Sequence, residues 1–299
     1  PPQSTTVLFR QNWTMDASTQ LILTYSYAVA TVLLAIGALR YESATFLPAI
    51  LACLGALGAA LWLNSTWLSL IVLAAAMLLP ALGSAQGTSS SIRGATRYLI
   101  WVTVPIPFLL TIPALLEQVS VHPQELEWYG RCAWLLVPAA VFWLNLFPLD
   151  AAMSLWANDA APLMPAFVWL VQQVVVLNKL MELWETNPLL WTQPTVLVVR
   201  AFALLTVLLS GVVATIQLSL PAVLGSAAMA TFGLAVLGIL SGTGEGLAAA
   251  RVILAGRSVA VLAACAALQV AYLHPGSEVK SVSISSRLVA LATLTVVTL

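Results

Sequence analysis

The sequence predicts an all-α integral membrane protein, a polytopic bundle of about ten transmembrane helices, and three observations support this prediction. Of its 299 residues, 61% are hydrophobic and only 7% are charged. The mean hydropathy is +0.99, whereas soluble domains are about 25% charged. The third observation is a series of apolar runs of about 20 residues, the length that crosses a hydrocarbon layer about 30 Å thick.

These apolar runs define the expected helices in order along the chain. The fourth is expected to be kinked because it contains Pro105, Pro107 and Pro113, which neighbouring helices tolerate in a membrane. Residues 83–94 are expected to form a Gly/Ser loop, and residues 148–165 a re-entrant or interfacial stretch. Nine complete helices are expected at residues 19–39, 44–63, 67–82, 97–117, 132–147, 166–184, 195–214, 221–240 and 247–273, and a tenth begins near Ser286.

We divide the chain into three parts on this basis. Residues 1–17 form an N-terminal segment, residues 18–273 one polytopic helical membrane domain, and residues 274–299 a loop with the start of a further helix. The first residue is proline and no basic, cleavable leader follows, so no signal peptide is expected.

The composition argues against several classes of function. The net charge is zero and no basic run occurs, which argues against nucleic-acid binding. No Walker loop, GxSxG, HExxH or GxGxxG motif is present, and the three cysteines and two histidines lack metal-ligand spacing. We therefore expect no catalytic residue, no cofactor, no metal ion and no nucleotide bound by this chain.

Ionisable residues at membrane depth are the candidate functional residues, because a charge is expensive there. Lys179 and Glu182 are three residues apart, hence on one helical face and able to pair. Arg257 lies deep in the helix expected at residues 247–273. These three are the proton-path candidates, although a lysine can also snorkel to the interface and an arginine can pair with a carbonyl or a lipid phosphate. Gln172 and Gln173, nearer the middle of their helix, are polar but do not titrate.

Several short motifs follow one another in a defined order. Asn64-Ser65-Thr66 forms a tight turn before an apolar helix, and Arg97-Tyr98-Leu99 begins the next helix. Further on come Leu146-Phe147-Pro148, then Trp156 and Asp159, then Ala161-Pro162-Leu163-Met164-Pro165, then Gln217-Leu218-Ser219-Leu220 leading to Gly225 and Gly233. Over roughly residues 10–270, this order resembles the antiporter-like membrane subunits of respiratory complex I (NADH-quinone oxidoreductase) and of multisubunit cation/proton antiporters.

The resemblance also implies which charges are missing. In the family, buried charges form a hydrated axis along which protons move. The family's buried glutamate falls on or near Ala74 and its paired lysine on Trp143, while Lys179, about one turn out of place, is the nearest equivalent of its central lysine. Its later Lys-Arg pair falls on Pro221 and Ala222, and its next histidine and lysine fall near Gly256 and Ala260, with Arg257 close by. The resemblance thus implies a family-like scaffold that has lost the usual proton path.

Three functions compete. The first is a largely structural, antiporter-like subunit in the membrane arm of a complex I-type proton-translocating NAD(P)H- or ferredoxin-quinone oxidoreductase or a related assembly. The second is an active proton or cation translocator with a rebuilt path through Lys179 and Glu182, and the third is an unrelated solute permease. The first implies other membrane subunits and lipids as partners, with electron transport carried out elsewhere in the complex. It also implies an energy-coupling membrane: the bacterial inner membrane, the thylakoid or the mitochondrial inner membrane.

Overall fold

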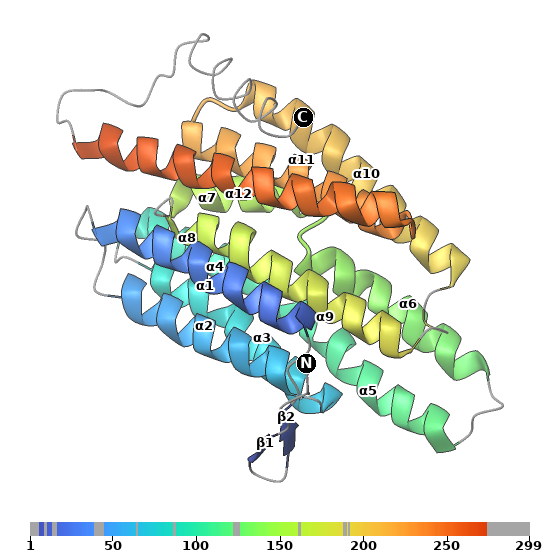
Figure 1. Ribbon diagram of the computed structural model, residues 1–299. Coiled ribbons are helices and arrows are strands. Elements are labelled where there is room, and N and C mark those ends of the chain that lie inside the picture. Colours follow the sequence, from blue (N-terminus) through green and yellow to red (C-terminus); the bar gives the residue numbers. More distant parts are fainter. Residues whose placement is uncertain are drawn as a thin grey trace.

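Long helices that run side by side build the molecule, as the computed structural model in Figure 1 shows. The structure describes residues 6–8, 11–13, 17–38, 45–63, 65–85, 88–121, 126–160, 163–187, 190 and 192–273. Two three-residue strands, β1 (Thr6–Leu8) and β2 (Gln11–Trp13), pair antiparallel with Thr6 opposite Trp13. The helices that follow are α1 (Ala17–Ala38), α2 (Phe46–Trp62), α3 (Thr66–Ser84), α4 (Ser89–Thr103), α5 (Ile106–Val121), α6 (Leu126–Trp143), α7 (Asp150–Asp159), α8 (Leu163–Phe167), the π-helical turn η1 (Val168–Gln172), α9 (Gln173–Thr186), α10 (Gln193–Ile216), α11 (Leu220–Leu240) and α12 (Gly244–Leu273).

The helices form a bundle around one central element. α10, α11 and α12 pack side by side on one side, α1, α2 and α3 lie on the other, and the continuous run α8–η1–α9 passes between them (Figure 1). Almost every residue of that run is buried, whereas α10 exposes a series of large apolar side chains. The exposed side chains of α10 include Leu197, Leu204, Leu208 and Val212. Together they form an apolar surface of the kind that lipid hydrocarbon covers.

The predicted fold class is confirmed. Among the described residues, seven helices are long and apolar enough to cross a membrane, counting α4–α5 and α8–η1–α9 as one each, and α2 is a shorter apolar helix of 17 residues. Each of the nine complete helices expected from the sequence has a counterpart. The tenth, expected from Ser286, lies outside the described residues.

The expected Gly/Ser loop at residues 83–94 is wrong over much of its length. α3 continues to Ser84, and α4 begins at Ser89. The Thr88 side chain accepts a hydrogen bond from the backbone N–H of Ser91, so it caps the new helix. Hydroxyl side chains that favour a loop in water are here the cap and first turn of a helix.

Two proline-containing segments interrupt the helices. The expected kink in the fourth helix is a break at Val104–Pro105, between α4 and α5. A second break separates α6 from α7, where Asn145 has a φ of 54° and the Phe147–Pro148 peptide is cis. The segment expected to be re-entrant or interfacial therefore contains the helix α7, and its Met153, Ser154 and Trp156 are buried in the bundle.

Side chains from other helices bind the backbone groups that the second break leaves free. The Phe147 N–H donates to Thr206 Oγ1 of α10 at 2.7 Å, and Thr206 Oγ1 donates to Phe202 O. The amide nitrogen of Gln173 lies 3.3 Å from Leu144 O. Irregular backbone at membrane depth requires such partners, because lipid offers none.

Small residues set the spacing of α10 and α11. A Cβ atom added to Gly233 of α11 would lie 2.9 Å from Val207 Cγ2 and 3.0 Å from Ala203 O, both in α10. A Cβ atom on Gly55 of α2 would meet nothing within 4 Å. Only the first glycine is needed for close helix approach.

We therefore expect Gly233→Ala to lower the free energy of unfolding by about 1–3 kcal/mol, because the added methyl group forces the two helices apart. Gly55→Ala is the matched control, and its stability should be unchanged or slightly raised, because alanine favours a helix over glycine. Thermal unfolding in detergent can be followed with a thiol-reactive dye, since Cys53, Cys132 and Cys265 are all buried and unpaired. Equal melting temperatures for the two variants would contradict this account of the α10–α11 contact.

Candidate functional site

Two adjacent glutamines at the end of η1 and the start of α9 make hydrogen bonds to opposite halves of the bundle. The amide nitrogen of Gln172 donates to Ala76 O at 3.0 Å and to Cys53 Sγ at 3.2 Å. The Tyr98 hydroxyl lies 2.9 Å from Gln172 Oε1 and 2.8 Å from Met77 O, and its single proton serves one of them at a time. Gln172 thereby connects the central helix to α2, α3 and α4.

Gln173 makes the corresponding contacts on the other side. Its Oε1 accepts a 2.7 Å hydrogen bond from Arg257 Nη2 of α12, and its amide nitrogen lies 3.3 Å from Met229 Sδ of α11. The guanidinium carbon of Arg257 stands 4.9 Å from the centre of the Phe232 ring, a cation–π contact. Arg257 is 1% exposed, so the amide oxygen and the ring replace part of the hydration of its guanidinium.

A third set of contacts involves α1. The Tyr25 hydroxyl donates to Leu170 O of the π-turn at 3.0 Å and lies 2.7 Å from Ser258 Oγ, next to Arg257. We call the polar side chains of these three sets the polar layer. Its members are Tyr25, Cys53, Tyr98, Gln172, Gln173, Arg257 and Ser258.

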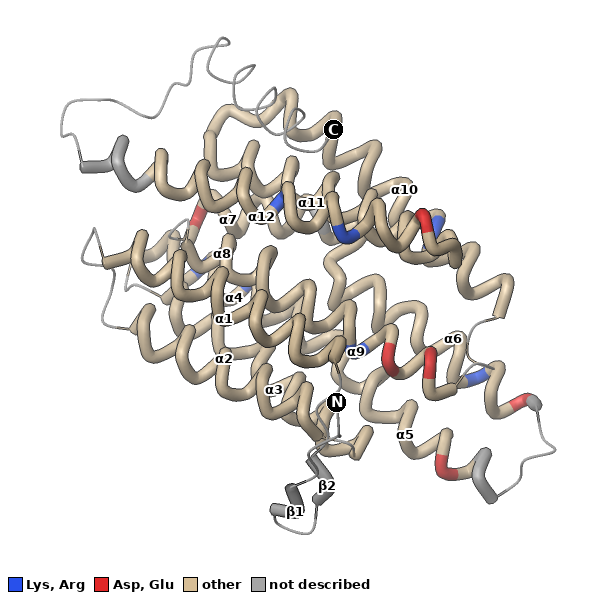
Figure 2. Tube along the Cα trace, in the orientation of Figure 1, with Lys and Arg blue, Asp and Glu red and all other residues tan. Residues whose placement is uncertain are grey.

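The polar layer lies near the middle of helices that are long and apolar enough to cross a membrane. Arg257 is about 20 Å along α12 from its first residue at the helical rise of about 1.5 Å per residue, and Gln173 lies near the middle of α8–η1–α9. Acidic residues gather instead toward the ends of α5, α6 and α9 (Figure 2). The polar layer thus carries one cation and no carboxylate.

The structure pairs Lys179 with Glu182, as their spacing predicts. Lys179 Nζ lies 2.8 Å from Glu182 Oε2, and the side chains are 5% and 46% exposed, respectively. Lys179 is about two turns beyond Gln172, and its ionic partner is Glu182, whereas Arg257 is bound by Gln173. The three proton-path candidates therefore form two separate groups. Their part in proton transfer stays a prediction.

Apolar side chains occupy the two positions where the resemblance places the family's glutamate and lysine. Ala74 of α3 is 7% exposed, and Trp143, the last residue of α6, is 1% exposed. Both belong to the hydrophobic core of the bundle.

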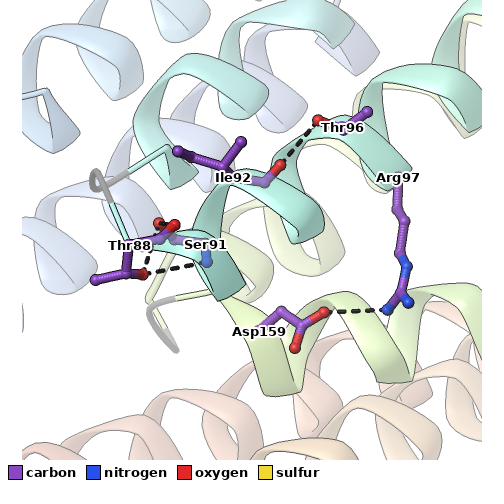
Figure 3. A network of polar contacts seen from close by, with 6 residues as sticks. All are labelled: Thr88, Ser91, Ile92, Thr96, Arg97 and Asp159. Atoms are coloured by element: carbon purple, nitrogen blue, oxygen red, sulfur yellow. Dashed lines mark hydrogen bonds and ion pairs between the residues drawn. The ribbon is translucent and has the colours of Figure 1, made fainter.

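The structure brings together two of the motif segments. Arg97 Nη1 of α4 forms an ion pair with Asp159 Oδ2 of α7 at 3.1 Å (Figure 3), and the rings of Tyr98 and Trp156 stack with centroids 4.5 Å apart. A Cβ atom on Gly94 would lie 2.9 Å from Asp159 Cβ, so this glycine permits the close approach of α4 to α7.

The chemistry of the polar layer is hydrogen bonding and charge. No group of three His, Cys, Asp or Glu side chains that could hold a metal occurs in the described ranges. Sequence reasoning noticed Gln172 and Gln173 but missed Cys53 and Tyr98, which bind Gln172, and Tyr25, which binds Leu170 O and Ser258. The available signal was the glutamine pair itself, because two amides inside an apolar helix require partners from other helices.

Comparisons with known proteins agree with the resemblance of the motifs at the level of the fold. No protein-family model matches the sequence, and no curated protein matches it. Among solved structures, a chain of the Mrp complex from Dietzia sp. DQ12-45-1b is similar with a TM-score of 0.74 and 16% identity, over 88% of this chain and 31% of that one. A chain of respiratory complex I from Thermus thermophilus with bound NADH is similar with a TM-score of 0.75 and 19% identity, over 92% of this chain and 62% of that one.

A chain of the archaeal membrane-bound sulfane sulfur reductase is also similar, with a TM-score of 0.72 and 13% identity, over 89% of this chain and 47% of that one. This chain thus spans about a third to three fifths of the length of these structures. At such identities the similarity shows the fold: this is a membrane protein with the fold of an antiporter-like membrane subunit.

The contacts of Gln173 generate a prediction about stability. We expect Gln173→Leu to lower the free energy of unfolding by about 2–4 kcal/mol, because it leaves the buried Arg257 Nη2 and Leu144 O without their partner. Gln118→Leu, the same change at an exposed position of α5, should alter it by less than about 0.5 kcal/mol. Thermal unfolding in detergent compares the two variants; a similar small effect of both would mean that the Gln173 bonds contribute little.

Proposed function

We propose that this chain is an antiporter-like subunit in the membrane arm of a complex I-type oxidoreductase or a related multisubunit assembly, where its role is largely structural. Its partners are other membrane subunits and lipids, and it is located in an energy-coupling membrane. The fold similarity to chains of the Mrp complex, complex I and the sulfane sulfur reductase supports this assignment over an unrelated solute permease.

The observation that carries the structural role is the side chain at Trp143. A proton relay requires titratable groups or ordered water within hydrogen-bond reach. The indole of Trp143 is 1% exposed within the core, so it fills space that a water chain would need. The neighbouring polar layer consists of amides, hydroxyls, a thiol and one arginine, and the amides cannot exchange protons by titrating at neutral pH.

A specific observation favours the second function, an active translocator. Lys179 is buried and forms an ion pair with Glu182. The Glu182 side chain is about half exposed, so it reaches the edge of the bundle. A pair of this kind could pass a proton between the aqueous edge and the interior. The two functions make opposite predictions for Lys179.

For a structural subunit, we expect Lys179→Ala and Lys179→Met to leave proton pumping per assembled complex almost unchanged. Methionine keeps most of the volume of lysine, so it separates loss of charge from loss of packing. Pumping is measured as acidification of membrane vesicles after addition of the electron donor, normalised to complex abundance on a native gel. Arg93→Ala, at an exposed position of α4, is the control for loss of one positive charge. Loss of most pumping at normal complex abundance in both Lys179 variants would favour the active translocator.

A subunit of a larger complex is also expected to stay with its partners. After solubilisation in mild detergent, the tagged chain should migrate with other membrane subunits on a native gel, because the exposed apolar faces of its described helices suit contacts with other subunits. Isolation as a stable, monodisperse and active monomer would be inconsistent with the proposed assembly.

A further inference from the structure

We propose that Arg257 is an electrostatic barrier that keeps protons and metal cations from crossing the centre of the bundle. The inference rests on the proposed function, in which this subunit does not conduct protons, and it assigns the residue that prevents conduction.

The first step is the charge itself. A guanidinium stays protonated at neutral pH and only donates hydrogen bonds, so it cannot accept a proton from a relay. A buried cation is normally neutralised by a carboxylate, because an unpaired charge is costly in a low-dielectric interior. Arg257 forms no ion pair with any residue that the structure describes.

The second step is the neutrality of the surroundings. Arg257 contacts the Gln173 amide from α9 and the Phe232 ring from α11, and its neighbour Ser258 faces Tyr25 of α1. Within the part of the chain that the structure describes, Arg257 Nε and Nη1 have no hydrogen-bond partner. The hydrogen bond and the cation–π contact stabilise the cation without cancelling its charge, so a positive potential remains at mid-depth.

The third step is position. The polar layer supplies hydrogen-bonding side chains at this depth from α1, α2, α4, α9 and α12, and Arg257 is its one cation. A second unit charge about 4–5 Å from Arg257 is disfavoured about a hundredfold or more at an effective dielectric constant of about 20. An arginine placed in this way repels cations from the polar side chains around it.

The test measures passive proton flux in liposomes that contain the purified full-length protein or its complex. A potassium gradient with valinomycin sets an inside-negative potential, and an internal pH dye reports proton entry. Wild-type protein should add no flux to that of empty liposomes, and Arg257→Gln should raise the flux by at least about tenfold, because it removes the repulsion. Arg251→Gln, which removes an exposed charge from the same helix, should stay tight.

Gln173→Glu is a second variant in case Arg257→Gln does not fold. It keeps the side-chain size and the oxygen that binds Arg257 while placing a neutralising carboxylate beside the guanidinium, so it should also raise the flux.

Unchanged flux in a folded, monodisperse Arg257→Gln or Gln173→Glu protein would overturn the barrier. A wild-type protein that conducts, with flux reduced in Arg257→Gln, would overturn both the barrier and the proposed function. A wild-type protein that conducts, with higher flux in Arg257→Gln, would keep the barrier and reject the structural role.

Discussion

A polar side chain in the centre of a membrane bundle has to find all its hydrogen-bond partners within the protein, and this constraint organises the molecule around Gln172 and Gln173. The two amides are adjacent in sequence, so their side chains leave the helix about 100° apart. Gln172 binds groups of α2, α3 and α4, while Gln173 binds groups of α11, α12 and the break between α6 and α7. Each half of the bundle therefore contributes to satisfying the same short stretch of the central helix.

The same requirement explains why the bundle tolerates a helix broken at depth. Between α6 and α7 the backbone leaves its helical path, and the freed groups would be unpaired in lipid. Thr206 of α10 and Gln173 of the central helix supply the missing partners. The Gln173 amide binds Leu144 O of the break through its nitrogen and Arg257 through its oxygen. The irregular backbone and the buried cation therefore depend on the same side chain.

The sequence was sufficient for the membrane class, for the positions of the long helices and for the Lys179–Glu182 pair, because these follow from hydropathy and from spacing along one helix. It was insufficient for contacts between helices. Arg97 and Asp159 were each noticed as parts of motifs 62 residues apart, yet nothing in periodicity indicates that they form an ion pair. The start of α4 at Ser89 was missed because serines and threonine before a helix have the composition of a loop, and only the bond from Ser91 N to Thr88 distinguishes a cap. Tyr25 and Ser258, 233 residues apart, are beyond any local pattern.

The π-helical turn η1 takes up one extra residue in the central helix. A π-turn accommodates one more residue than an α-helical turn, and each residue of an α-helix adds about 100° of rotation. Loss of one residue between Val168 and Gln172 would therefore restore a regular helix and leave Lys179 and Glu182 facing nearly the same way relative to Leu163–Phe167. Conversion of the turn to a regular α-helix without such a loss would instead rotate everything beyond it by roughly the 100° of one residue. The wide turn thus lets the central helix contain one more residue while its second half keeps its neighbours.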